Sequence, residues 1–407
     1  ILSKEFIMSQ FFARLTPKQK QYLATIQTPY YLLDERAIID NLSVTQKVCH
    51  ESGAKALLAL KCFATWGVFE SMQPYLHGTT SSSLKEVRLG KECFGGETHA
   101  YSVAYADHEI KEVLGYCDKI IFNSINQLKR FGQLAHDKNI PVGLRLNPQT
   151  SNSSFIIADP ARPFSRLGEH DVESIMAIAD QITGVMIHNN CENTDFEAFS
   201  QSLTDIENRF GELFHRLEWI SFGGGIHYID QNYPLDKFIN RLKNFSETYG
   251  VQIYLEPGEA SVHQGAVLVT SVLDVMYNNK PLAVVDASIE AHMLDLLIYR
   301  QSSPLAYVNE TTYDITGADF DGTSADETSV RIYGKSCLAG DIFGDYTLNE
   351  PLKIGDKVAF GNAAAYTMVK KNWFNGVDMP SIVIIRQDGE IMIQRQFDYE
   401  DYKASLS

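Results

Sequence analysis

The sequence predicts an α/β protein: a parallel (β/α)8 TIM barrel joined to a smaller domain built mostly of β-strands. Two observations support this fold class. Between residues 55 and 258, short β-type runs alternate with longer amphipathic stretches, which is typical of a closed parallel barrel. After about residue 265, short strand-like runs follow one another directly. We therefore expect a barrel over residues 36–265, and a β-sandwich or β-barrel domain over residues 266–407 that also takes residues 8–35.

The barrel requires eight strands, and eight candidate runs are present. In chain order they are KALLALK (55–61), GTTSSS (78–83), ETHAYSV (97–103), KIIFNS (119–124), VGLRLNP (142–148), GVMIHN (184–189), EWISFGG (218–224) and VQIYLEPG (251–258). GTTSSS is polar, and its assignment depends on its place in the series. Between the strands, DHEIKEVLGYC and PLDKFINRLKNFSETYG have the apolar spacing of helices. Gly250 ends the second of these as a C-terminal glycine.

The second domain is predicted from alternating β-type runs. These are GAVLVTSVLDVMY (265–277), PLAVVDAS (281–288), SVRIYG (329–334), DKVAFG (356–361), AYTMVK (365–370) and SIVIIRQDGEIMIQRQF (381–397). Asp388-Gly389 predicts a hairpin turn within the last run. The early run PYYLLD (29–34) precedes the first barrel helix, and we expect it to join this second domain.

Composition and charge restrict the class of function. The chain has 407 residues, 44% hydrophobic and 21% charged, which is ordinary for a globular protein with a large core. Its net charge of −16 argues against nucleic acid as a partner and fits a cationic substrate. No run approaches the roughly 18 apolar residues of a membrane helix, and no secretory leader is evident, so we expect a cytoplasmic protein without a membrane partner. Residues 1–7, which precede Met8, are left out of the fold prediction.

The cysteines give no sign of a disulfide framework or a zinc site. All six are scattered and none belongs to a C-x-x-C pair: Cys49, Cys62, Cys93, Cys117, Cys191 and Cys337. Reduced thiols are therefore expected. Because no His, Asp and Glu residues have ligand-like spacing either, we expect no bound metal.

Lys61 stands at the end of an apolar run, where a cation is unfavourable. One interpretation is structural: the aliphatic part of the side chain packs against apolar neighbours while its ammonium group reaches water. Alternatively, a lysine in a dry pocket loses its proton and attacks a carbonyl to form a Schiff base. The choice depends on what else lies at the same end of the barrel.

Three further polar features end predicted barrel strands, where barrel enzymes place their chemistry. His188 is either a hydrogen-bonded core histidine or a ring that stacks on a ligand. Gly223, Gly224 and Gly225 form either a tight turn or a loop whose N–H groups approach a phosphate. Glu256 caps a turn or holds a ring nitrogen protonated.

Together these features match the requirements of pyridoxal 5'-phosphate. The lysine forms the imine, the flat ring stacks, the glycine loop takes the phosphate, and the acid keeps the pyridine nitrogen cationic. A protonated pyridine is an electron sink for the carbanion left when a bond at Cα breaks. We therefore interpret Lys61 as the Schiff-base lysine.

Longer motifs resemble a known family. LALK (58–61), SRLG (165–168), FGGG (222–225), EPGEA (256–260) and CLAGD (337–341) are similar to the fold-type III pyridoxal-phosphate decarboxylases, the group of ornithine and diaminopimelate decarboxylases. Within that group, EPGEA, EAHMLD (290–295), CLAGD and TMVKKNWFNG (367–376) resemble the carboxynorspermidine/carboxyspermidine decarboxylase branch. The resemblance runs from about Thr28 to the C-terminus.

The resemblance implies further roles for individual residues. Tyr366 would contact the phosphate. Cys337 would protonate the decarboxylated carbon in the site of the partner subunit, so that a homodimer shares its active sites. Asp341 would accompany Cys337, and Arg166 is a candidate for binding an anion near the substrate. Without the resemblance, Cys337 reads as a small buried hydrophobe and Arg166 as a surface residue.

Two departures from ornithine decarboxylases bear on the substrate. Glu259 stands where an arginine follows their EPG motif, and Leu338 replaces their acidic residue after the cysteine. The usual anchor for ornithine's amine is thereby removed. If this chain supplies the amine-binding acids from other positions than ornithine decarboxylases do, Glu259 and Asp295 are the candidates. They would meet the amines of a longer polycation. The alternative for Asp295 is a solvated loop acid.

The predicted activity is therefore decarboxylation of carboxynorspermidine or carboxyspermidine to norspermidine or spermidine, with pyridoxal phosphate. One alternative is the same chemistry on diaminopimelate or ornithine. An alternative of another class is a non-catalytic homologue that binds a regulatory protein. A racemase and a metal-dependent barrel lyase fit the motifs less well.

Overall fold

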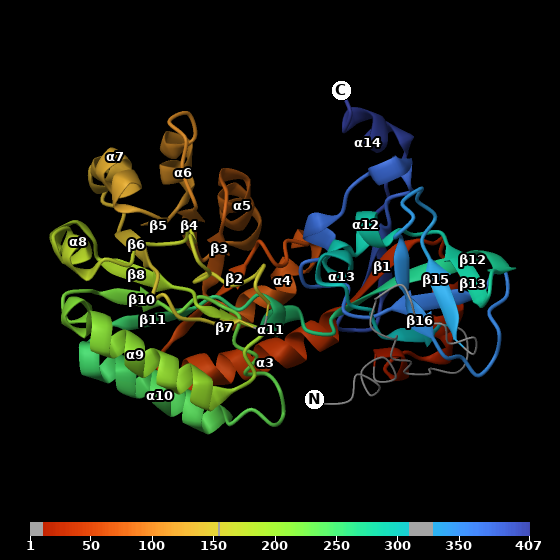
Figure 1. Cartoon of the computed structure of the whole chain (residues 1–407), viewed down its shortest axis with the longest axis horizontal. Coiled ribbons are helices and arrows are strands. Elements are labelled where there is room, and N and C mark those ends of the chain that lie inside the picture. Colours follow the sequence, from red (N-terminus) through yellow and green to blue (C-terminus); the bar gives the residue numbers. More distant parts are fainter. Residues whose placement is uncertain (1–10, 154, 309–328) are drawn as a thin grey trace. The chain divides into compact units, whose positions relative to one another are not determined.

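Eight parallel strands form a closed barrel in the order β10-β11-β2-β3-β4-β5-β6-β8, which confirms the predicted fold class (Figure 1). The structure, a computed structural model, describes residues 11–153, 155–308 and 329–407. Each of the eight predicted strands is present. They are β2 (Lys55–Ala59), β3 (Gly78–Ser81), β4 (Glu97–Ser102), β5 (Lys119–Phe122), β6 (Val142–Leu146), β8 (Gly184–Ile187), β10 (Trp219–Ser221) and β11 (Gln252–Leu255).

Helices alternate with the barrel strands, beginning with α3 before β2, and are amphipathic where they are long. They are α3 (Glu35–Ser52), α4 (Phe69–Met72), α5 (Leu84–Leu89), α6 (Ile110–Tyr116), α7 (Ile125–His136), α8 (Val172–Met176), α9 (Phe196–Phe214), α10 (Leu235–Tyr249) and α11 (Glu259–Val262). As predicted, α10 ends at Gly250, which adopts the left-handed conformation with φ 68°. The short strands β7 (Asn152–Ser153) and β9 (Asn190–Cys191) pair beside the barrel.

A large side chain fills the inside of the barrel. Trp219 lies against Gly143 and Gly184, where a Cβ atom would stand only 2.5 and 2.1 Å from its indole ring. Glycine at both positions therefore leaves room for the indole ring against strands β6 and β8. Leu57 and Tyr254 belong to the same buried cluster. The interior is packed and not a pore, so the chemistry is confined to the mouth.

Chain contacts divide the molecule into two units. The barrel unit is Ile39–Ser261, and the sheet unit comprises the segment that ends at Ile38 together with Val262–Ser407. The sheet unit contains strands β1 (Tyr30–Asp34), β12 (Ala266–Tyr277), β13 (Pro281–Val285), β14 (Leu305–Tyr307), β15 (Val330–Tyr333), β16 (Ile342–Tyr346), β17 (Lys357–Phe360), β18 (Ser381–Ile385) and β19 (Ile391–Arg395). Its helices are α2 (Pro17–Thr25), α12 (Ile289–His292), α13 (Leu294–Tyr299) and α14 (Tyr399–Ala404).

The N-terminal strand β1 lies inside the sheet of the second unit, as predicted. It runs antiparallel to β12, with Tyr30 opposite Val269, and parallel to β18, with Tyr30 opposite Ser381. The sheet order is β16-β15-β13-β12-β1-β18-β19, and β17 pairs with both β12 and β14. All five residues of β1 are buried, which explains its continuous apolar run.

One predicted strand is wrong. AYTMVK (365–370) alternates like a strand, but Tyr366 has φ 49° and Met368–Lys370 form a 3-10 turn. The Thr367 hydroxyl donates to the Ala365 carbonyl at 2.8 Å, and Lys370 N–H donates to the Thr367 carbonyl at 3.0 Å. These local bonds satisfy the backbone in place of a sheet partner.

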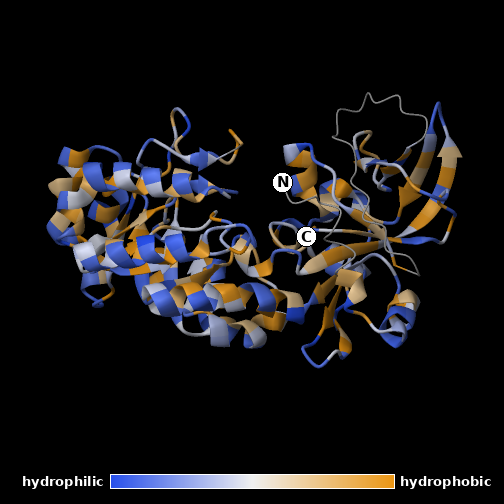
Figure 2. Cartoon of the chain, turned by 90° about the horizontal axis from the view of Figure 1, so that it is seen from below, coloured by the Kyte–Doolittle hydropathy of each residue, from blue (hydrophilic) through white to orange (hydrophobic). Residues whose placement is uncertain are grey.

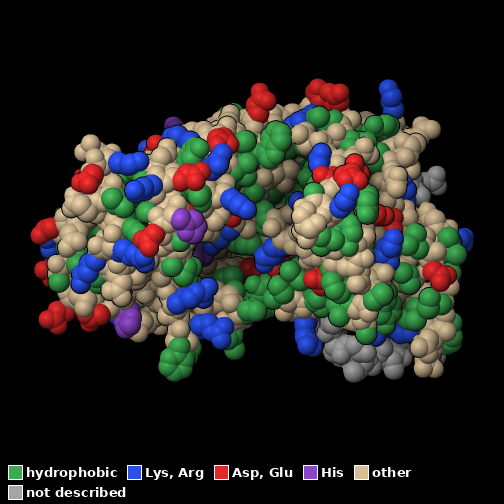
Figure 3. Space-filling view, turned by 90° about the horizontal axis from the view of Figure 1, so that it is seen from above, with side chains coloured by type: hydrophobic (Ala, Val, Ile, Leu, Met, Phe, Trp, Pro, Cys, Tyr) green, Lys and Arg blue, Asp and Glu red, His purple; other side chains and the backbone are tan. Residues whose placement is uncertain are grey.

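Hydropathy and surface charge follow this architecture. Figure 2 shows strands rich in hydrophobic residues and helices of mixed hydropathy around the barrel. On the face in Figure 3, acidic and basic side chains are interspersed and form no continuous basic area. In the described residues, none of the helices combines the length and hydropathy needed to span a membrane.

Candidate active site

Lys61 lies in the turn that directly follows β2 at the mouth of the barrel. The turn is tight, since Cys62 N–H donates to the Ala59 carbonyl at 3.0 Å. The lysine side chain faces a pocket and keeps accessible area there, although protein surrounds it. Burial and, secondly, the charge of Arg145 lower the pKa of Lys61, and Glu256 acts more weakly in the opposite direction. The neutral amine, which is the nucleophilic form, is thereby favoured.

The pocket around Lys61 is formed at the carboxyl ends of six barrel strands: β2, β3, β4, β6, β8 and β11. This is the end where barrel enzymes carry out their chemistry. Its lining is Ala59, Lys61, Thr80, Ser81, Ser82, Tyr101, Arg145, Met186, His188 and Glu256. Three of the predicted site residues therefore share one pocket.

His188 follows β8 and presents an uncharged ring to this pocket. Burial and the positive charges of Lys61 and Arg145 keep the pKa of His188 well below its ordinary value. Its ring packs against the glycine loop, because a Cβ atom at Gly223 would stand 2.6 Å from His188 Nδ1. A flat neutral ring held in this way is suited to stacking on an aromatic ligand.

The glycine loop follows β10 and leaves no room for side chains. Gly223 and Gly225 have φ values of 64° and 81°, a conformation that favours glycine. A Cβ atom at Gly224 would lie 2.3 Å from the Glu256 carbonyl oxygen, and one at Gly225 would lie 2.1 Å from the Asn190 carbonyl oxygen. The backbone N–H groups of such a loop can closely approach an anion.

Glu256 follows β11 and is held by a hydroxyl. Ser221 Oγ donates to Glu256 Oε1 at 2.6 Å and accepts from Gly223 N–H at 3.2 Å. The side chain is buried and lines the pocket with Lys61. This bond links the acid to the glycine loop and orients its carboxylate.

Two pocket residues were not identified from the sequence. Arg145 on β6 is buried, and its Nη1 donates to Tyr101 Oη at 2.7 Å; that hydroxyl donates to Asn123 Oδ1 at 2.9 Å. Burial raises the pKa of Tyr101, whereas the charges of Arg145 and Arg166 oppose the rise. Arg166 has an exposed side chain, and its backbone carbonyl accepts a hydrogen bond from Asn123 Nδ2 at 2.8 Å. The signal for Arg145 was present, because VGLRL contains a charge inside an apolar strand, as LLALK does.

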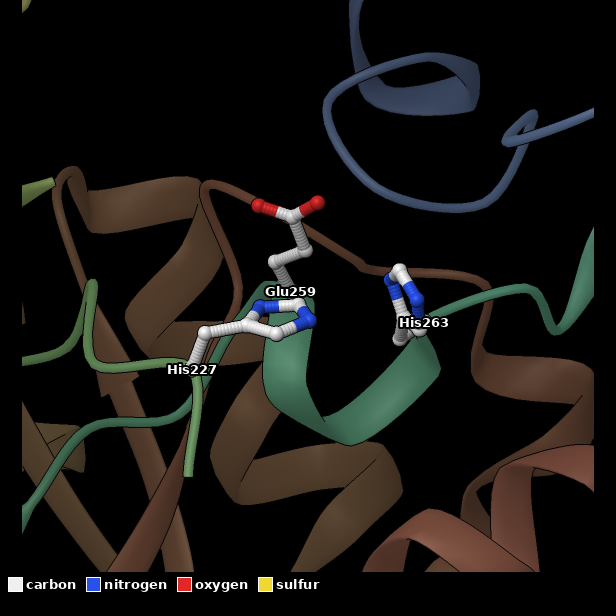
Figure 4. Close-up of side chains that lie close together, drawn as sticks. All are labelled: His227, Glu259 and His263. Atoms are coloured by element: carbon white, nitrogen blue, oxygen red, sulfur yellow. The ribbon is translucent and has the colours of Figure 1, made fainter. Parts of the chain in front are cut away.

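Glu259 begins α11 and lies beside two histidines (Figure 4). The ligand-type atoms of Glu259, His227 and His263 all lie within 4.8 Å of one another. Burial lowers the pKa of His227, and the carboxylates of Asp230 and Glu192 act against this change. Sequence spacing did not reveal this group of three side chains. Glu259 and His263 are four residues apart at one helical turn, whereas His227 comes from a distant loop that spacing alone does not bring to them.

In the sheet unit, Asp295 pairs with a lysine next to the predicted phosphate-binding tyrosine. The carboxylate of Asp295 on α13 accepts a hydrogen bond from Lys370 Nζ. The same Nζ lies 5.3 Å from the centroid of the Tyr366 ring. Asp295 is therefore part of a half-buried charged group and not a solvated loop acid.

Cys337 is exposed on a loop of the sheet unit. Its N–H donates to Asn375 Oδ1 at 2.7 Å. Asp341, which is buried, accepts from Ile289 N–H at 2.7 Å and from Ser336 N–H at 3.0 Å. Both carboxylate oxygens of Asp341 thus hold the loop that carries the cysteine.

Comparison with known proteins identifies the family. The profile of the family "Pyridoxal-dependent decarboxylase, C-terminal sheet domain" matches residues 31–364. The chain belongs to the pyridoxal-dependent decarboxylases. It is 56% identical over 382 residues to a carboxynorspermidine/carboxyspermidine decarboxylase of Herminiimonas arsenicoxydans, covering 94% of this chain and 100% of the relative.

Two further relatives of this decarboxylase cover nearly its whole length. A carboxyaminopropylagmatine decarboxylase of Synechocystis is 33% identical over 403 residues, which is 98% of this chain and 100% of the relative. The crystal structure of carboxynorspermidine decarboxylase from Campylobacter jejuni, in complex with norspermidine, superimposes with a TM-score of 0.82 at 36% identity. It covers 93% of this chain and 100% of that one.

The residues of the barrel mouth fit pyridoxal phosphate, the cofactor of this family. The pocket contains a lysine of lowered pKa, a neutral histidine ring and an oriented carboxylate, and the glycine loop next to it excludes side chains. When bound, the cofactor supplies an aldehyde for the amine and a ring that withdraws electrons from Cα. The protein is therefore a cofactor-dependent carboxy-lyase.

Proposed function

We propose that this enzyme decarboxylates carboxynorspermidine or carboxyspermidine to norspermidine or spermidine in polyamine biosynthesis. The observation that supports it most strongly is the 56% identity over 94% of the chain to a decarboxylase of these compounds. The pocket supplies the groups that the chemistry needs, and the net charge of −16 favours a polycationic substrate.

In this proposal the barrel residues bind and orient the cofactor. Lys61 would hold the cofactor through its neutral amine and would give way to the amine of the substrate. His188 stacks on the ring, and Gly223, Gly224 and Gly225 bind the phosphate with their backbone N–H groups. Glu256, oriented by Ser221, keeps the ring nitrogen protonated through a charge-assisted hydrogen bond.

The residues of the sheet unit complete the site in a homodimer. Cys337 of one chain donates its proton to the carbon that has lost CO₂ in the site of the other chain. Asp341 maintains the loop that presents Cys337 through its two backbone hydrogen bonds. Tyr366 contacts the phosphate.

Glu259 and Asp295 meet the ammonium groups of the polyamine, and Arg166 is the anion-binding residue near the substrate. Asp295 already has a cationic partner in Lys370. The substrate would have to compete with that lysine for the carboxylate.

A panel of substrates tests the proposal. CO₂ release is measured for carboxynorspermidine, carboxyspermidine, carboxyaminopropylagmatine, diaminopimelate and ornithine with cofactor present. We expect the highest kcat/KM with one of the first two compounds. A higher kcat/KM with carboxyaminopropylagmatine would instead indicate the activity for which the Synechocystis relative is named. A preference for diaminopimelate or ornithine, or no turnover of any compound, would refute the proposal.

A further inference from the structure

We propose that His227, Glu259 and His263 form a binding site for a divalent transition-metal ion such as Zn²⁺, and that the bound ion excludes substrate from Glu259. The metal site stands on the geometry of the three side chains. Its inhibitory effect rests on the proposed function, in which Glu259 meets an ammonium group of the polyamine.

Two of the ligands are set by a single helical turn. Glu259 begins α11 and His263 follows its last residue, so the two are four residues apart, a spacing that places side chains on one helix face (Figure 4). Because this is one continuous turn, their spacing does not depend on how the two units are arranged. The third ligand, His227, comes from the loop after β10 in the barrel unit, to which Glu259 also belongs.

The distances and the donor set fit zinc. The three ligand-type atoms lie within 4.8 Å of one another. Around a tetrahedral zinc ion with bonds of about 2.0–2.2 Å, ligand atoms stand roughly 3.3 Å apart, so modest side-chain rotations close the site. Two imidazole nitrogens and one carboxylate oxygen are a common zinc set that leaves a fourth position for water. Calcium and magnesium prefer sites built of more oxygen atoms.

The surroundings of the cluster attract a cation. All three side chains are half-buried, where charge acts more strongly than in bulk water. The carboxylates of Asp230 and Glu192 act on His227, and the carboxylate of Glu259 acts on Cys191. The carboxylates of Asp230 and Glu192 therefore add negative charge near His227.

Occupation of the site would oppose substrate binding. A divalent ion on Glu259 neutralises the carboxylate and takes one of its oxygens, so a substrate ammonium loses its partner. A carboxylate alone binds an ammonium group through charge-assisted hydrogen bonds, whereas the histidines add selectivity for the metal. We expect reversible inhibition that raises KM and leaves kcat unchanged.

The experiment measures Zn²⁺ binding and inhibition on the holoenzyme. Zn²⁺ affinity is determined by competition with a chromogenic chelator for the wild type, His227→Ala, His263→Ala and the matched control His50→Ala, a surface histidine at the end of α3. We expect one ion per chain, an affinity at least tenfold weaker in the two cluster variants, and no change in the control. Uptake of no ion, or equal affinity in all four proteins, would overturn the site.

Inhibition separates this inference from the proposed function. Each protein is assayed with increasing substrate at fixed Zn²⁺, relative to its own rate with EDTA. Competitive inhibition that is lost in both cluster variants supports the whole inference. If Zn²⁺ binds as expected but does not compete with substrate, the competition is refuted and Glu259 does not meet the ammonium group. If CO₂ release identifies a different substrate while Zn²⁺ binding still requires the histidines, the proposed function fails and the metal site stands.

Discussion

The barrel unit and the sheet unit hold their functional groups in different ways. In the barrel unit, Lys61, His188 and Glu256 each follow a buried parallel strand, and their positions are set by the closed sheet. In the sheet unit, Cys337 lies on an exposed loop held by side-chain bonds from Asp341 and Asn375. Strand ends thus fix the cofactor groups through the fold itself, whereas the loop depends on a few hydrogen bonds.

The two units also treat their lysines differently. Lys61 faces a pocket surrounded by protein, and desolvation together with the positive charge of Arg145 lowers its pKa, which favours the neutral amine. Lys370 instead pairs with the carboxylate of Asp295. In the proposed function, the same type of side chain is therefore a nucleophile in one setting and a counter-ion in the other. This contrast predicts which lysine carries the chemistry.

Removal of the Lys61 amine should affect activity more than any other change. We expect Lys61→Ala to lower turnover by at least about 10³-fold, because no other amine lies in the pocket lining to hold the cofactor. Lys129→Ala, on the exposed face of α7, is the matched control and should retain full activity. Turnover of Lys61→Ala within tenfold of wild type would contradict the assignment.

A complementation experiment tests whether the two units act across a dimer. Cys337→Ala should reduce product formation by about 10²–10⁴-fold, as expected for loss of a general acid. Co-expressed Lys61→Ala and Cys337→Ala chains should recover about a quarter of wild-type activity, since half of randomly formed dimers are mixed and one of their two sites is intact. Cys93→Ala, another exposed cysteine, serves as the control. No recovery in purified mixed dimers would rule out shared sites.

Asp341→Asn tests the dependence of the cysteine loop on hydrogen bonds. Asparagine presents an NH₂ group to one of the two backbone N–H donors, so the free energy of unfolding should fall by about 1–3 kcal/mol. Activity should fall with it, because the loop carrying Cys337 is released. Urea denaturation of this variant is compared with that of Asp378→Asn, at an exposed aspartate of the same unit. Unchanged stability would show that the loop is fixed by other contacts.

Glu259→Gln probes substrate recognition in the barrel unit. A hydrogen bond to a charged group contributes about 1.5–3 kcal/mol, so KM for the preferred carboxylated polyamine should rise roughly tenfold or more. The value of kcat should change little. Glu247→Gln on the surface of α10 provides the control. An unchanged KM would remove Glu259 from the substrate site.

The smallest expected effect concerns pH. Arg145 is one cause of the lowered pKa of Lys61, so Arg145→Met should raise that pKa. Because only the neutral amine reacts, cofactor uptake by the apoenzyme should then require higher pH. Arg145→Lys keeps the positive charge and should shift the profile less. A shift of the Arg145→Met profile toward lower pH would contradict the electrostatic explanation.

Much of the architecture was predictable because the barrel strands are short buried runs in a regular series. Even the polar GTTSSS run forms β3, since its place in the series outweighs its composition. AYTMVK was misread because its alternation does not reveal the left-handed conformation of Tyr366. His227 and Glu259 escaped notice as partners because the barrel brings them together from distant parts of the chain.

Identification of the lysine that holds pyridoxal phosphate tests the central claim most directly. The holoenzyme is reduced with borohydride, digested, and the labelled peptide is sequenced by mass spectrometry. We expect the cofactor on the peptide that contains Lys61, in wild type and in Lys129→Ala alike. Label on another lysine, or none at all, would contradict the account.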